Sequence, residues 1–106
     1  MTATPPTMAE ALARIWTKFL PDLEQRVTIL EEAAQALAAG SLNKEQRASA
    51  HAAAHKLAGT LGTFGLHRGT DLARQAKLGF AEENAASAAD LSSWITELRT
   101  VIDQRK

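Results

Sequence analysis

The sequence has 106 residues, no cysteine and a formal net charge of zero. Its length suits one domain with a modest core, so we predict a single domain over residues 1–106. The lack of cysteine excludes disulfides and cysteine-based zinc sites, and the balanced charge argues against nucleic acid as a partner. With no long apolar run and no signal-peptide pattern, we expect a cytoplasmic protein without a membrane partner.

The sequence up to Gly40 predicts two helices. Thr7 can cap the first, and Glu10, three residues later, completes a capping box. Pro21 ends or kinks this helix, or begins the next one. The second helix then runs to Gly40, a good C-terminal cap. Apolar residues recur at helical spacing in both, namely Leu12, Ile15, Trp16 and Phe19, then Leu23, Val27, Leu30, Ala34 and Leu37.

Three further helices are expected after Gly40. Asn43 and Gln46 form a capping-box-like start for the first, which closes at Gly65. A short helix from about residue 68 is stopped by Gly79, and a last one runs from about Asn84 to Asp103. The last helix is expected to bury Leu91, Trp94, Ile95, Leu98, Val101 and Ile102.

The fold class that these helices predict is all-α. Alanine is abundant, and no alternation typical of strands is visible. We therefore predict an antiparallel up-and-down four-helix bundle with an additional short N-terminal helix.

The helix that follows Asn43 carries the most informative residues of the chain. At about 100° per residue, its apolar stripe consists of Ala50, Ala54, Leu57, Leu61 and Phe64. His55 lies roughly 140° from the middle of that stripe. Four small residues lie around it, namely Ala48, Ala52, Gly59 and Gly62. A histidine in such surroundings points outward and can be approached by another protein.

This part of the sequence resembles the histidine-containing phosphotransfer (Hpt) domains of multistep phosphorelays. The pattern of that family is a histidine, a leucine-like residue two on, usually a lysine three on and a glycine four on. His55, Leu57 and Gly59 match it, and the small-residue turn near Gly65 follows. The resemblance is specific from about Ala50 to Lys77.

The chain departs from the family pattern at Ala58, where a lysine is usual. That lysine is taken to help neutralise the phosphoryl group, so its absence bears on transfer rate and phosphohistidine lifetime. Lys56 is a poor replacement, because it lies roughly 100° around the helix from His55. Arg68 and Lys77 are the remaining candidates.

The resemblance implies that His55 is phosphorylated. His55 would accept a phosphoryl group from the aspartate of one receiver domain and pass it to another, as a phosphohistidine in two-component signalling. The chain would not be an enzyme with its own ATP site, because no Gly-rich phosphate loop is present. It would need no cofactor, and magnesium is expected on the receiver partner.

The partners implied are response-regulator receiver domains, with a hybrid sensor histidine kinase as a further candidate; we expect a monomer. Between Lys44 and Lys77 there are six basic and two acidic residues, a balance that suits an acidic partner site or simply solvated helix faces. The docking surface and phosphoryl environment are expected to comprise Lys56, Ala58, Gly59, Gly62, Ala52, His51 and Arg68.

Two alternatives stay open. Because Ala58 replaces the usual lysine, the chain could instead be a helical docking domain that binds a partner without being phosphorylated. His51 and His55, four residues apart, could together hold zinc. No carboxylate ligand accompanies them, so we predict no metal site. Arg74 and Gln75 could reach toward His55 from the next helix.

Overall fold

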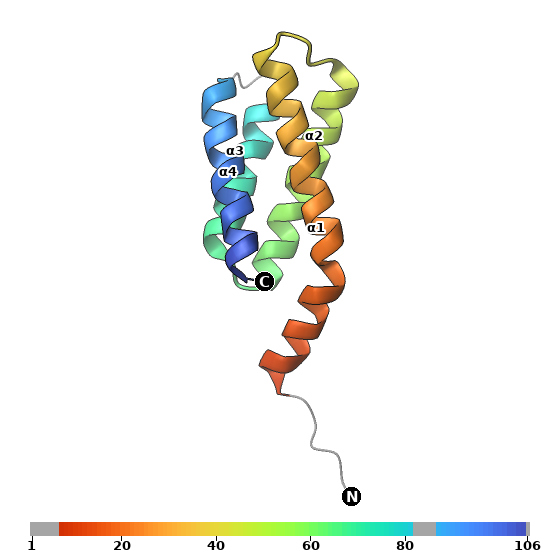
Figure 1. The fold of residues 1–106 in the computed structure, drawn as a ribbon, viewed down its shortest axis with the longest axis vertical. Helices are drawn as coiled ribbons and strands as arrows, with labels where there is room; N and C mark the ends of the chain where they lie inside the picture. Colours follow the sequence, from red (N-terminus) through yellow and green to blue (C-terminus); the bar gives the residue numbers. More distant parts are fainter. Residues whose placement is uncertain (1–6, 82–86, 106) are drawn as a thin grey trace, which may run out of the picture.

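The computed structural model describes residues 7–81 and 87–105, and these form four helices without a strand. The helices are α1 (Met8–Ala38), α2 (Lys44–Thr63), α3 (His67–Phe80) and α4 (Ala88–Arg105). Each helix packs against two neighbours in the cyclic order α1, α2, α3, α4, and consecutive helices run in opposite directions (Figure 1). This is the all-α, up-and-down four-helix bundle expected from the sequence.

The expected break at Pro21 is corrected by the structure. α1 is one helix of 31 residues that contains Pro21, so the additional short N-terminal helix is the first part of α1. A proline inside a helix removes a hydrogen bond and costs about 3 kcal/mol. Trp16 and Leu23, on either side of it, are 3% and 1% exposed. Their burial anchors the helix before and after the proline, and this offsets the local cost.

Local capping signals fix the helix ends at the α1–α2 turn and at the α2–α3 turn. Asn43 and Gln46 make the expected capping box at the start of α2. Gly40 and Gly65 have φ values of 73° and 72°, a left-handed conformation in which glycine is favoured. After α2, Gly65 N–H donates to Gly62 O and Leu66 N–H to Leu61 O. These paired bonds form a Schellman motif, which ends α2 where the sequence predicted.

The ends of α3 and α4 differ slightly from the prediction. α3 continues past Gly79, because Phe80 is fully buried and its carbonyl accepts a hydrogen bond from Arg47 at 3.2 Å. Burying a phenylalanine contributes roughly 1.5–3 kcal/mol, more than the roughly 1 kcal/mol that a helical glycine costs. α4 ends at Arg105, and the expected start at Asn84 lies outside the described residues.

The core lies along the bundle axis and contains most of the expected apolar residues. The first part of α1 extends beyond the ends of α2 and α4 (Figure 1). There Ile15 and Phe19 are 43% and 45% exposed, although the helical spacing placed them on the same apolar face as Trp16, which is buried. Trp16 closes this end of the core: its ring meets Phe64 edge-on at 5.1 Å between centroids, and the Arg105 guanidinium lies over it at 5.4 Å.

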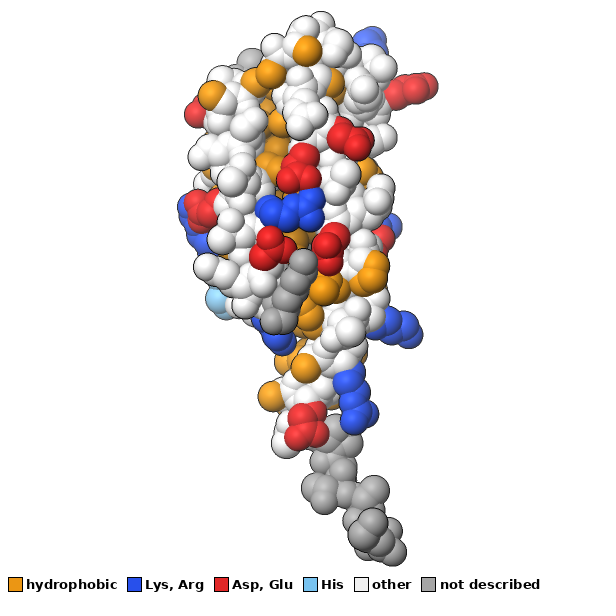
Figure 2. Space-filling model, in the orientation of Figure 1, with side chains coloured by type: hydrophobic (Ala, Val, Ile, Leu, Met, Phe, Trp, Pro, Cys, Tyr) orange, Lys and Arg blue, Asp and Glu red, His pale blue; other side chains and the backbone are white. Residues whose placement is uncertain are grey.

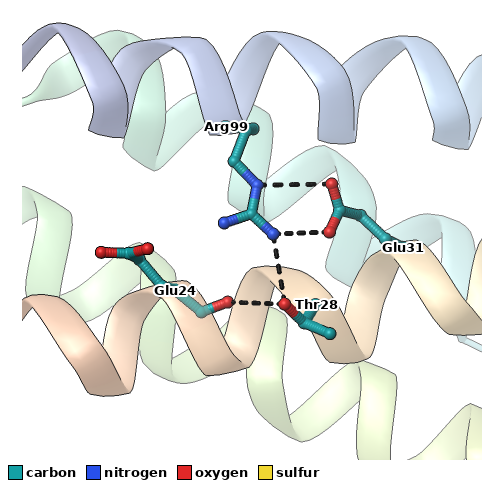
Figure 3. A network of polar contacts seen from close by, with 4 residues as sticks. All are labelled: Glu24, Thr28, Glu31 and Arg99. Atoms are coloured by element: carbon teal, nitrogen blue, oxygen red, sulfur yellow. Dashed lines mark hydrogen bonds and ion pairs between the residues drawn. The ribbon is translucent and has the colours of Figure 1, made fainter.

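A polar network joins α1 to α4 (Figure 3). Arg99 of α4 donates two hydrogen bonds to the Glu31 carboxylate and one, of 3.2 Å, to Thr28 Oγ1. The hydrogen bonding to Glu31, together with the negative charge of that carboxylate, raises the pKa of Arg99 above its ordinary value. On the face that carries α1 and α4, acidic side chains gather around a basic one (Figure 2). None of the four helices is long and apolar enough to cross a membrane.

Candidate functional site

His55 lies on the exposed side of α2, as the helical pattern predicted. Ala54, just before it, and Leu57, two residues after it, are fully buried, whereas the imidazole is exposed. Among the described residues, His55 has no hydrogen-bond or ion-pair partner. The ring is therefore held by the helix alone and is open to a partner molecule.

Gly59 leaves the imidazole uncovered. Side chains on a helix lean toward its N-terminus, so a side chain at position 59 would cover the turn that contains His55. A Cβ added to Gly59 would meet nothing within 4 Å. The packing of this chain therefore does not require glycine at position 59, and the visible effect of Gly59 is clearance beside His55.

Gly62 has a different environment from Gly59. A Cβ added there would lie 3.4 Å from Thr70 Oγ1 of α3. Gly62 is exposed, but it lies on the side of α2 that borders α3, where an added Cβ would make an ordinary van der Waals contact. The two glycines were expected to share one role, and the structure separates them.

Ala58 is packed against α3 as well. Its side of α2 is buried, with 9% of the residue exposed. Its carbonyl oxygen accepts a 3.2 Å hydrogen bond from Thr70 Oγ1. Thr70 itself is 6% exposed, so this bond holds α2 and α3 together in a buried setting. The sequence reasoning missed Thr70; its signal is a lone hydroxyl among the buried positions of α3.

The other expected residues on α2 are exposed. His51 lies one turn before His55, Ala52 is next to His51, and Lys56 lies on the side toward α1. None of the three makes a side-chain hydrogen bond or ion pair with another described residue. Within residues 7–81 and 87–105, no group of three or more histidine, aspartate or glutamate side chains could hold a metal ion.

Arg68 is not brought to His55. Its guanidinium donates two hydrogen bonds to Glu97 of α4, one of them 2.9 Å long. The hydrogen bond raises the pKa of Arg68 and lowers that of Glu97 below its ordinary value of 4.5. Gln75 lies seven residues after Arg68 and so shares this side of α3. The expectation that Arg68 belongs to the phosphoryl environment is therefore corrected: it faces α4.

Comparison with known proteins gives two matches. The family model of the Hpt domain matches residues 14–106. Protein RcaC of Microchaete diplosiphon is 36% identical over 95 residues, which cover 87% of this chain and 15% of that protein. The chain thus spans only a small part of that relative. No solved structure is significantly similar to it.

Proposed function

Because the chain belongs to the Hpt domain family, we propose that it is a phosphorelay intermediate that carries a phosphoryl group on His55. The observation that carries this proposal is the exposed imidazole of His55 on α2 beside the open position of Gly59. A partner can therefore bring its own reactive group to the ring without displacing any side chain of this chain.

The proposed reaction is an in-line transfer between an aspartate and His55. The lone pair of Nε2, the ring nitrogen that the family usually uses, attacks phosphorus of the partner's aspartyl phosphate. A nitrogen–phosphorus bond forms as the phosphorus–oxygen bond breaks, and the released electron pair leaves the partner with a free carboxylate. The proton stays on Nδ1 of His55. Attack by a second aspartate on the phosphohistidine reverses these changes.

In the proposed transfer, this chain and the receiver contribute different parts of the reaction. α2 supplies a positioned nucleophile, and the partner receiver is expected to supply magnesium and most of the charge stabilisation. The segment from Lys44 to Lys77 has six basic and two acidic residues, so its field favours the approach of an acidic receiver site. A cytoplasmic location and a monomeric state remain part of this proposal.

The second candidate function is docking without phosphorylation. The observation that favours it is Ala58. A lysine is usual at this position in the family, whereas here the position holds an alanine that is packed against α3. In that case the exposed side of α2 would bind a receiver, and His55 would never take up a phosphoryl group.

One transfer experiment separates the two functions. The purified chain is incubated with a radiolabelled, phosphorylated receiver domain and magnesium, and acid-labile label is followed on wild type, His55→Gln and His51→Gln. We expect label on wild type and on His51→Gln, the matched exposed control, but none on His55→Gln. Receiver binding by the wild type without any label would establish the docking function instead.

A further inference from the structure

The position of His55 relative to α3 can be derived from a neighbouring contact. Gly62 faces α3, since a Cβ on it would lie 3.4 Å from Thr70 Oγ1. His55 precedes Gly62 by seven residues, which is about two helical turns, so both lie on nearly the same line along α2. His55 therefore lies on the part of the exposed surface that borders α3, whereas Lys56 lies toward α1.

The same step along α3 leads from Thr70 to Lys77. Thr70 faces α2, because its hydroxyl donates to Ala58 O. Lys77 follows Thr70 by seven residues and so lies on the same line of α3. Arg47 of α2 bonds the carbonyl of Phe80, which confirms that the two helices stay in contact along this direction.

Since α2 and α3 run in opposite directions, the two steps lead the same way along the bundle. Gly62 and Thr70 lie side by side on the two helices. His55 and Lys77 lie about 10 Å from them in the same direction along the bundle, so these two residues are at the same level. Side chains lean toward the N-terminus of their own helix, so in this antiparallel pair the two lean in opposite directions along the bundle, and the long, flexible stem of Lys77 can turn back to bring its ammonium to the ring. Lys77 is thus the basic residue of α3 that the packing places beside His55.

The state of Lys77 suits a role in binding an anion. Its side chain is half-buried, and it forms no hydrogen bond or ion pair with another described residue. Among the described residues, the other titratable or charged groups on this side are His51 on α2 and Arg74 on α3, both exposed. Asp71 lies further round α3, away from α2. A lysine stem that lies along the helix surface can carry its ammonium toward a group on a neighbouring side chain.

We propose that Lys77 binds the phosphoryl group on His55, in place of the lysine that is missing at Ala58. The inference rests on the proposed function. The ammonium donates hydrogen bonds to the phosphoryl oxygens and stabilises their second negative charge. The positive charge thus comes from α3 rather than from α2.

A partner-free experiment tests this proposal. The small phosphodonor phosphoramidate is used to phosphorylate wild type, Lys77→Ala and Lys77→Arg, with Lys56→Ala as control for the loss of one nearby lysine. Phosphorus NMR then follows the titration of the phosphoryl group on His55. We expect Lys77→Ala to raise its second pKa by about half a pH unit, as for a partly exposed ion pair. Lys77→Arg should restore the wild-type titration, and Lys56→Ala should shift it much less.

The outcomes separate this inference from the proposed function. If phosphoramidate labels His55 and the titrations of wild type and Lys77→Ala coincide, Lys77 does not bind the phosphoryl group, although the phosphorelay function stands. An equal shift in Lys77→Ala and Lys56→Ala would also overturn the inference, since it would reflect net charge alone. A wild-type chain that takes no label on His55 would overturn both proposals.

Discussion

Two helix contacts of this bundle are built from different kinds of residue. Between α2 and α3 lies a small-residue seam, where Ala58 and Gly62 lie beside Thr70, and Gly69 lies against Leu61. Between α1 and α4 lies a polar seam, where Arg99 binds Glu31 and Thr28. In the small-residue seam a single hydroxyl bonds a backbone carbonyl, whereas the polar seam uses a guanidinium and a carboxylate to join its helices.

The difference shows how the fold leaves charge available beside His55. At the polar seam the positive charge of Arg99 is used to hold two helices together. At the small-residue seam, close packing of short side chains does this, and Lys77 and Arg74 next to it bond no other described side chain. Short side chains also leave the imidazole uncovered, so a partner can reach it.

The largest effect is expected from filling the small-residue seam at Gly69. A Cβ there would lie 3.0 Å from Leu61 Cδ1 and 3.3 Å from Val101 Cγ1, and Leu61 is fully buried. Gly69→Val should therefore lower the free energy of unfolding by about 2–3 kcal/mol through overpacking. Urea denaturation measures this free energy, and Gly59→Val serves as the control because position 59 has open space around it. Equal stability of the two variants would show that the seam is not tightly packed.

Gly59→Gln should separate stability from transfer. The free energy of unfolding should rise by about 0.5 kcal/mol, because glutamine is a better helix former and finds open space. Labelling of His55 from a receiver should fall about tenfold, equivalent to about 1.4 kcal/mol, since the new side chain covers the ring. Labelling by phosphoramidate, which is small, should change far less. A receiver that transfers to this variant at the wild-type rate would contradict the clearance role of Gly59.

Breaking the polar seam should cost stability without affecting His55. Arg99→Met should lower the free energy of unfolding by about 1 kcal/mol, the modest figure reflecting partial exposure of both partners. Together with Glu31→Gln it forms a double-mutant cycle, whose coupling energy isolates the ion pair. Labelling of His55 should remain as in wild type. A loss of labelling in the folded Arg99→Met variant would show that the two seams are coupled.

The features that the sequence predicted correctly depend on local signals. The capping box of Asn43 and the turns at Gly40 and Gly65 involve residues within one or two turns of each other. The exposure of His55 also follows from the pattern of its own helix. Pro21 and Gly79 misled the prediction because their local cost is offset by distant packing, around Trp16 and Phe80.

The surroundings of His55 could be predicted only in part. Whether Arg68 or Lys77 lies near it depends on which side of α3 packs against α2 and which against α4. That arrangement follows from buried contacts such as the one from Thr70 to Ala58, and no spacing within a single helix reveals it. The phosphorylation of His55 itself stays a prediction, to be decided by labelling.

The smallest effect is expected from the ion pair between Arg68 and Glu97, on the side of α3 that faces α4. The hydrogen bond from Arg68 lowers the pKa of Glu97 below its ordinary value of 4.5. A carboxyl group with a lowered folded-state pKa adds stability that is fully present above the unfolded pKa and is lost as the pH falls through the folded one. This contribution should therefore be present at pH 6, begin to decline near pH 4.5 and vanish once the pH has fallen below the lowered pKa of Glu97. Urea midpoints of wild type and Glu97→Gln should differ at pH 6 and converge at low pH. Since this exposed pair holds neither seam, Glu97→Gln should leave the labelling of His55 unchanged, and curves that stay parallel throughout would contradict the ion-pair origin of the difference.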